Sequence, residues 1–458
     1  MPPDLDAYLE AHRQEHLDRL IAYLRIPSIS AHGQGIPEAA EHARGLLERA
    51  GLGRARVIPT DGGPMVLAER IEHADRPTLL VYGHYDVQPP DPLEEWLSPP
   101  FEPTVRPAKG APGGERLYAR GVADNKAQHL AHVLAIESLV ATEGRLPCNV
   151  RVLLDGEEEI GSPQMAPFVD AHRDELAADL CVISDGTVDE SGRSVVRFGV
   201  RGVLSFELRA RGANRDLHSG HWGDVAPNPL WTLVHLLATM KNDRGEVTIE
   251  GFYDAVEPMT QLERDALERL GEDVGAITRQ LGLTELAPHP GGGVAERRAA
   301  WPAFTINGLH GGYGGAGSKT VLPHEAFAKC DIRLVEAQSA DDVWRKLVAH
   351  VRRHAPGVGL IHHGSMEPSK TPLDSPYAAP LGRALAAVEG QEPLLLPAMG
   401  GSLPEYVFTK TLGVPCFGVP FGNPDQANHA PNENLELARF FRGIRTAAAI
   451  LRELGADR

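Results

Sequence analysis

Long hydrophobic runs are missing from this chain of 458 residues. No stretch of about 18 consecutive apolar residues occurs, so the sequence predicts no membrane-spanning helix. The first residues, Met1 to Asp4, also lack the basic region and the apolar core of a signal peptide. We therefore expect a cytoplasmic protein that does not act on a membrane.

Basic residues are scarce relative to acidic ones. The chain has 45 Lys and Arg against 62 Asp and Glu, which gives a net charge of −17. Nucleic acids and anionic membranes bind basic surfaces, so this balance argues against both as partners.

Cysteine is also scarce, and the four cysteines lie far apart, at Cys148, Cys181, Cys330 and Cys416. No two of them form a CxxC pair. Such isolated cysteines are more typical of free thiols in a reducing cytoplasm than of disulfides.

Strand and helix patterns alternate in the two end portions of the chain. Short apolar runs at 78–82, 149–154 and 179–183 are typical of buried strands, and helical patterns follow them. We predict an α/β fold for residues 1–194 and 372–458, with a mostly parallel sheet and helices on both faces. Residues 195–371 begin with two segments, 195–200 and 203–210, that alternate as antiparallel strands do, and helical patterns follow, which predicts an inserted α+β domain.

The strand predicted at 149–154 runs directly into an acidic turn. Four acids occur within five residues, at Asp155, Glu157, Glu158 and Glu159. Like charges a few ångströms apart repel strongly in a site of low dielectric constant, so a packed turn of this kind needs a cation or shared protons. The alternative is an acidic loop exposed to solvent.

Other metal-type side chains also follow predicted strands, namely His84, Asp86 and Asp185, while Asp124 begins a helix and His429 lies in a polar loop. Ligands of open parallel sheets bind beyond the carboxyl ends of the strands, so these side chains are expected to converge. Histidine with carboxylates and without cysteine suits zinc, manganese or cobalt. Asp86 lies on the same face of the extended chain as His84 and can accept its second hydrogen bond. Any one of these residues alone has a structural explanation, and only the joint pattern indicates a metal site.

The chain resembles the di-metal aminoacylase and carboxypeptidase family of metallopeptidases, and most closely its carnosinase-type cytosolic nonspecific dipeptidases. The resemblance covers nearly the whole chain and implies a fold like that of the di-zinc exopeptidases. Its motifs are GHYD (83–86), RGVADNK (120–126), EEIGS (158–162), ISD (183–185), DLHSG (216–220), KTVLP (319–323), IRLV (332–335), GGS (400–402) and NHAPNE (428–433).

The resemblance implies a role for each residue of the predicted centre. His84 and Asp185 would hold one metal ion, Glu159 and His429 the other, and Asp124 would bridge the two through a loop with a cis peptide bond to Asn125. Asp86 would orient His84, and Glu158 would be the general base. The cofactors would be two divalent ions, with zinc expected first and manganese or cobalt as alternatives.

The resemblance also assigns roles within residues 195–371, which would form a lid and dimerisation domain. His218 would reach the active site of the other subunit of a homodimer and stabilise the oxyanion. Arg333 would hold the terminal carboxylate of the substrate, and Thr320 and Ser402 would line the same site.

The function implied is hydrolysis of dipeptides, or other small amides with a free carboxylate, by a metal-held water with Glu158 as base. Two alternatives stay open. One is an N-acyl-amino-acid deacylase that uses the same site, and the other is a non-catalytic binding protein that keeps the fold.

Overall fold

The computed structural model describes residues 4–108 and 114–456. Met1 to Pro3, on which the expectation about the N-terminus partly depends, lie outside the described residues. The chain divides into two compact units. Unit 1 comprises Met1–Gly199, Lys370–Pro397 and Pro404–Arg458, and unit 2 comprises Val200–Ser369 and Ala398–Leu403.

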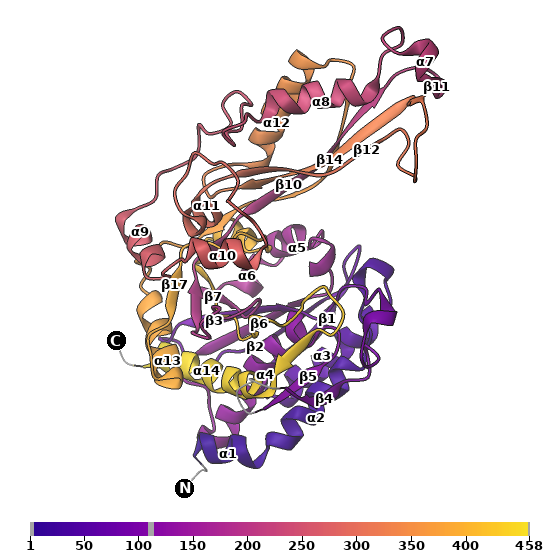
Figure 1. The fold of residues 1–458 in the computed structure, drawn as a ribbon. Helices are drawn as coiled ribbons and strands as arrows, with labels where there is room; N and C mark the ends of the chain where they lie inside the picture. Colours follow the sequence, from indigo (N-terminus) through magenta and orange to yellow (C-terminus); the bar gives the residue numbers. More distant parts are fainter. Residues whose placement is uncertain (1–3, 109–113, 457–458) are drawn as a thin grey trace. The chain divides into compact units, whose positions relative to one another are not determined.

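Unit 1 is built on an eight-stranded sheet in the order β1-β2-β6-β3-β7-β18-β8-β17 (Figure 1). The four neighbouring strands β6, β3, β7 and β18 are parallel, whereas β2 pairs antiparallel with both β1 and β6. The strands are β1 (Gly53–Ile58), β2 (Met65–Arg70), β3 (Thr78–His84), β6 (Asn149–Asp155), β7 (Leu180–Ile183), β8 (Val195–Arg197), β17 (Leu394–Leu396) and β18 (Cys416–Gly418). A separate three-stranded sheet contains β4 (Thr104–Pro107), β5 (Glu115–Tyr118) and β19 (Asn434–Glu436).

Helices cover both faces of this sheet. Side chains alternate along a strand, so Leu80 and Tyr82 of β3 face one side, where they pack with Phe168 and Phe408. The opposite side of β3 contacts α4, which in turn packs on α14. The helices of unit 1 are α1 (Leu5–Ala11), α2 (Arg13–Leu24), α3 (Ile36–Arg49), α4 (Ala127–Glu143), α5 (Met165–Ala171), α6 (Arg173–Leu176), α13 (Ala378–Glu389) and α14 (Leu437–Gly455). The predicted α/β class is confirmed.

Unit 2 contains an antiparallel sheet in the order β12-β14-β10-β15, with α8 and α12 packed on it. Its core gathers inward-facing strand residues, such as Phe206 and Ile332, and helix residues, such as Leu233 and Leu347. The elements are β10 (Gly202–Arg211), β12 (Ala303–Gly311), β14 (Glu325–Leu334), β15 (Gly359–Met366), α8 (Pro229–Met240) and α12 (Ala340–His354). Shorter ones are β11 (Leu217–His218), β13 (Val321–Leu322), α7 (Ser219–Trp222), α9 (Gln261–Glu268), α10 (Val274–Gln280) and α11 (Val294–Ala300).

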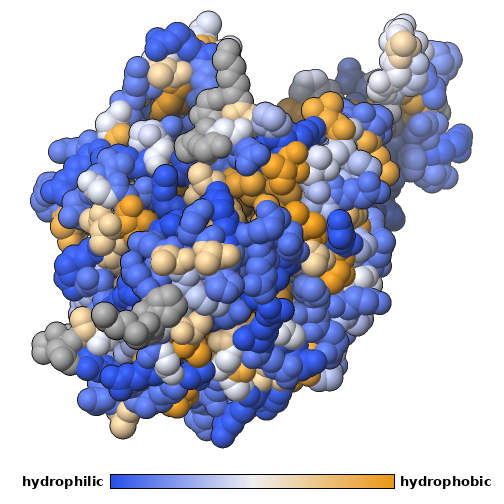
Figure 2. Space-filling model, turned by 90° about the horizontal axis from the view of Figure 1, so that it is seen from below, coloured by the Kyte–Doolittle hydropathy of each residue, from blue (hydrophilic) through white to orange (hydrophobic). Residues whose placement is uncertain are grey.

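Figure 2 shows a face made mostly of hydrophilic residues, with hydrophobic residues gathered in places between them. Among the described residues, no helix combines the length and the hydrophobicity that crossing a bilayer requires.

Candidate metal centre

Strand order brings two of the predicted ligands, together with the acidic turn, to one edge of the sheet. β3 lies between β6 and β7 and is parallel to both, so the three carboxyl ends are neighbours. β3 ends at His84, which is in register with Asp155 at the end of β6. Asp185 follows β7 by two residues. The polar side chains after these strands therefore meet at one place.

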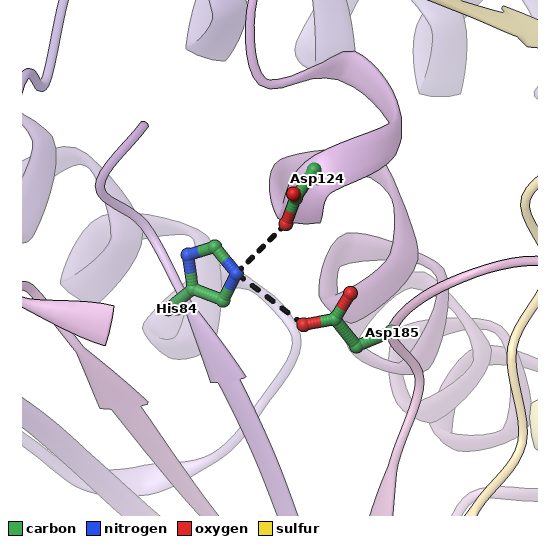
Figure 3. A group of neighbouring side chains, drawn as sticks. All are labelled: His84, Asp124 and Asp185. Carbon is green, nitrogen blue, oxygen red and sulfur yellow. Dashed lines mark hydrogen bonds and ion pairs between the residues drawn. The ribbon is translucent and has the colours of Figure 1, made fainter. Parts of the chain in front are cut away.

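One group of possible ligands surrounds His84 (Figure 3). Its Nε2 atom lies 3.1 Å from Oδ1 of Asp124 and 3.4 Å from Oδ2 of Asp185. All three residues are buried, and their ligand atoms lie within 4.8 Å of one another.

A second group shares Asp124 with the first. Its other oxygen, Oδ2, lies 3.0 Å from Nε2 of His429, which lies 3.2 Å from Oε2 of Glu159. These three ligand atoms also lie within 4.8 Å of one another. Asp124 therefore turns one oxygen to each group, as a carboxylate that bridges two ions would.

Asp86 holds both the histidine and the acidic turn. Its Oδ1 atom lies 3.3 Å from Nδ1 of His84 and accepts a hydrogen bond from the backbone N–H of Glu158 at 3.1 Å. Its Oδ2 atom accepts from the N–H of Glu159 at 3.0 Å. One buried carboxylate thus fixes the ring of His84 and the start of the turn that carries the two glutamates.

The loop that carries Asp124 is held by Glu433, a role that the sequence analysis missed. The buried carboxylate of Glu433 accepts from the N–H groups of Gly121, Ala123 and Asp124 at 2.9, 2.9 and 3.1 Å. Nη1 of Arg120 donates to the same carboxylate at 2.9 Å. The signal was present, because Arg120 and Glu433 are oppositely charged members of two motifs that already contain ligands.

Asn125 fills the space between the Asp124 loop and the sheet, and the peptide bond between the two residues is cis. Its Oδ1 accepts from the N–H of His84 at 3.3 Å, and its Nδ2 donates to the carbonyl of Ser184 at 2.6 Å. The packing requires glycine at 83, because a Cβ there would lie 2.5 Å from Cβ of His129.

The electrostatics of the cluster indicate that a cation fits it. Burial raises the pKa of Glu158 well above its ordinary value and that of Glu159 to about 7, and it also raises the pKa of Asp185. Burial opposes the charge on His84, yet its hydrogen bonds with Asp124 and Asp185 raise its pKa. Without a cation these groups would retain protons, whereas divalent ions would take their place.

The donor set fits the metal predicted from the sequence. It consists of imidazole nitrogens and carboxylate oxygens without a thiolate, which suits zinc, manganese or cobalt. Glu158 lies in the same turn as Glu159 but belongs to neither ligand group. Its carboxylate lies close enough to His84 and Asp185 to interact with their charges.

The four predicted substrate-binding residues all belong to unit 2 and form two pairs. Nη1 of Arg333 donates to Oγ of Ser402 at 2.8 Å. His218 and Thr320 lie on adjoining segments, because β11 pairs with β13 and the N–H of Ser219 donates to the carbonyl of Thr320. Nδ1 of His218 accepts from the N–H of Gly220 at 2.9 Å, so a neutral ring carries its proton on Nε2.

Comparison with known proteins identifies the family. The model of Peptidase family M20/M25/M40 matches residues 80–453, which is well over half of the chain. The protein therefore belongs to this family and is a hydrolase.

Similar proteins cover almost the whole chain. A human protein named Beta-Ala-His dipeptidase is 26% identical over 98% of this chain and 91% of its own length. The Cys-Gly metallodipeptidase DUG1 of Candida albicans is 28% identical over 98% of this chain and 96% of its own. A solved structure, the M20 family metallo-carboxypeptidase Sso-CP2 from Sulfolobus solfataricus, is 34% identical with a TM-score of 0.88, covering 96% of this chain and 99% of its own.

Proposed function

We propose that this protein is a dipeptidase that uses two divalent metal ions. The observation that carries the proposal is the pair of ligand groups that share Asp124, with the carboxylate of Glu158 left over beside them. The names of two similar proteins, Beta-Ala-His dipeptidase and Cys-Gly metallodipeptidase, support small peptides with a free carboxylate as substrates.

In this proposal unit 1 is the catalytic domain and holds both ions. His84 and Asp185 bind one ion, Glu159 and His429 bind the other, and Asp124 binds both. Zinc is the first candidate, because two imidazoles with carboxylates are typical zinc ligands, and manganese and cobalt accept the same donors.

The protein's own residues then move the proton. Bound ions would polarise the scissile carbonyl group and acidify a water molecule. Glu158 accepts the proton that this water loses and donates it to the nitrogen of the leaving amine, so the base becomes the acid within one turnover.

We assign substrate binding to unit 2. The planar guanidinium of Arg333 is suited to the terminal carboxylate of the peptide, with Ser402 beside it, while Thr320 lies beside His218. His218 offers an N–H on Nε2, the kind of donor that stabilises an oxyanion. We propose that it serves the other subunit of a homodimer.

The surface we propose for dimerisation lies on β12 and α8 of unit 2. β12 is an edge strand of its sheet and exposes Ile306 and Leu309, at 47% and 42%. α8 exposes Trp231 and Val234, at 58% and 40%. An edge strand beside exposed apolar side chains is a favourable surface for pairing with a second copy.

We propose a cytoplasmic location and no nucleic-acid partner. All four cysteines are unpaired and buried, as expected in a reducing compartment. The net charge of −17 would repel nucleic acid.

Metal analysis followed by a substrate panel tests the proposal. The purified protein, loaded with zinc, manganese or cobalt, is given neutral dipeptides and N-acyl amino acids. We expect hydrolysis of dipeptides with metal and none after chelation. Cleavage of N-acyl amino acids alone would make it a deacylase, and no hydrolysis with a full metal load would favour a binding protein.

Glu158→Gln is the first matched variant for this panel. It keeps the shape of the side chain but cannot take a proton, so we expect the same metal content and a turnover lower by roughly 10²–10⁴-fold. Unchanged turnover would remove Glu158 from the role of general base.

A further inference from the structure

Three arginines of unit 2 gather around residues 400–402. Nε and Nη2 of Arg201 donate to the carbonyl of Gly400 at 3.0 and 2.9 Å, and Arg333 donates to Ser402. Arg298 of α11 lies beside the same glycine, since a Cβ built on Gly400 would lie 3.8 Å from Cβ of Arg298 and 3.2 Å from Nη2 of Arg201.

The positive charge of this cluster is only partly neutralised. Asp331 lies 3.3 Å from Nε of Arg333, whereas Arg201 donates to the backbone carbonyls of Gly400 and Trp301. Within residues 4–108 and 114–456, no carboxylate forms an ion pair with Arg201 or Arg298. Three guanidinium groups and one carboxylate leave a local charge of about +2.

The positive charges of the three arginines repel one another. Burial, together with the charges of Arg333 and Arg298, lowers the pKa of Arg201 to about 10. The protein as a whole has a charge of −17, so a general excess of basic residues does not explain this cluster. An anion bound there would relieve the repulsion between the arginines.

We propose that Arg298 selects peptides whose C-terminal residue has an acidic side chain, aspartate or glutamate. The inference rests on the proposed function, in which Arg333 holds the terminal carboxylate. The donors of Arg201 already bind carbonyl groups, while Arg298 is exposed and offers a planar guanidinium to a second carboxylate. Arg298 is then a residue that determines specificity.

Pairs of isosteric dipeptides test this selection. We compare kcat/KM for Ala-Glu with Ala-Gln and for Ala-Asp with Ala-Asn, using the metal-loaded protein. Because a charge-assisted hydrogen bond contributes more than a neutral one, we expect the acidic member of each pair to be favoured by roughly tenfold. The preference should shrink as salt is added, because salt screens exposed charges.

Three variants assign the preference to its residue. Arg298→Gln should bring each acidic-to-amide ratio of kcat/KM close to one. Arg298→Glu puts a negative charge at the same place, so Ala-Lys should then be hydrolysed more efficiently than Ala-Glu. The matched control is Arg352→Gln, which removes an exposed arginine of α12 elsewhere in unit 2 and should leave the ratios unchanged.

The outcomes separate this inference from the function on which it rests. Hydrolysis of Ala-Gln and Ala-Glu at equal efficiency would overturn the selection and leave the dipeptidase intact. A preference that survives in Arg298→Gln would overturn the role of Arg298. Absence of hydrolysis for all dipeptides would instead remove the proposed function itself.

Discussion

At the scale of single residues, the centre depends on side chains that touch no proposed ligand atom but hold the backbone around it. Glu433 accepts three backbone hydrogen bonds from residues 121–124 and one from Arg120. His429, a proposed ligand, lies four residues before Glu433. The same carboxylate therefore ties the loop of one ligand to that of another.

Glu433→Gln should weaken metal binding by roughly 10–100-fold, the usual effect of removing a group that orients a ligand. The amide places N–H donors where a carboxylate now accepts, so the Asp124 loop loses part of its support. Titration of the metal-free protein with zinc measures the affinity, and circular dichroism checks the fold.

Glu436→Gln is the matched control for this experiment. Glu436 is also buried in an ion pair, but its side chain bonds to Arg116 and Arg439 and not to the backbone of the Asp124 loop. It should lose stability and keep its metal affinity. Equal affinities in both variants and the wild type would contradict the role given to Glu433.

The proposed ligands and the support that Asp86 gives to His84 could be predicted from the sequence, while the backbone contacts of Glu433 could not. His84 and Asp185 follow apolar strands, and the carboxyl ends of parallel strands meet, so their convergence follows from the order of elements. Glu433 bonds mainly to backbone N–H groups, which every residue except proline has. No side-chain pattern therefore specifies those partners, and only the folded loop reveals them.

At the scale of elements, the paired strands β11 and β13 bring together two of the four residues proposed to bind substrate, His218 at the end of β11 and Thr320 just before β13. His218 is exposed, and its hydrogen bond from Gly220 fixes which nitrogen carries the proton. The short pair is also held by Asp216, whose Oδ1 accepts from the backbone N–H of His324 at 3.0 Å.

If His218 serves the other subunit, two inactive variants should complement each other. His218→Ala keeps its metal ligands, and His84→Ala keeps its His218, so each mixed dimer regains one complete site. Random exchange should restore about a quarter of wild-type activity, since half of the dimers are mixed and each has one working site.

The neighbouring His221 provides a control, because its ring lies 4.7 Å from that of His218 and has no proposed role. His221→Ala alone should stay active. Exchange of tagged subunits without any return of activity would show that His218 does not act across the dimer.

Whether a segment forms a helix or a strand was easier to predict than which of the two units a short segment belongs to. The sequence predicts an inserted domain from residue 195, whereas the strand Val195–Arg197 belongs to unit 1 and pairs with β17 and β18 of the large sheet. Ala398–Leu403 groups with unit 2, although both flanking segments belong to unit 1. Such short segments are placed by long-range contacts, and local periodicity carries no information about them.

At the scale of the whole molecule, the two ligand groups link metal binding to stability. Hydrogen bonds with Asp124 and Glu159 raise the pKa of His429 to about 10, and burial raises that of Glu159 to about 7. In the unfolded chain Glu159 and His429 have their ordinary pKa values of 4.5 and 6.5 and lose their protons above them. The folded, metal-free protein keeps these protons to a higher pH. Its stability should fall as the pH rises through this range.

Metal ions should reverse this dependence, because they replace the protons at the same atoms. We expect the increase in Tm on adding zinc to grow from pH 5.5 to pH 8, roughly the range between the unfolded and folded pKa values. Thermal unfolding with zinc and with a chelator, at each pH, measures it. An increment that is constant or falls with pH would show that these groups do not exchange protons for metal.

Metal content per chain tests the central claim most directly, because the claim is that two ions share Asp124. Inductively coupled plasma mass spectrometry of the zinc-loaded protein should give about two ions per chain, and His429→Ala should give about one. A wild-type protein with one ion or none, or a His429→Ala variant that still binds two, would contradict the shared centre.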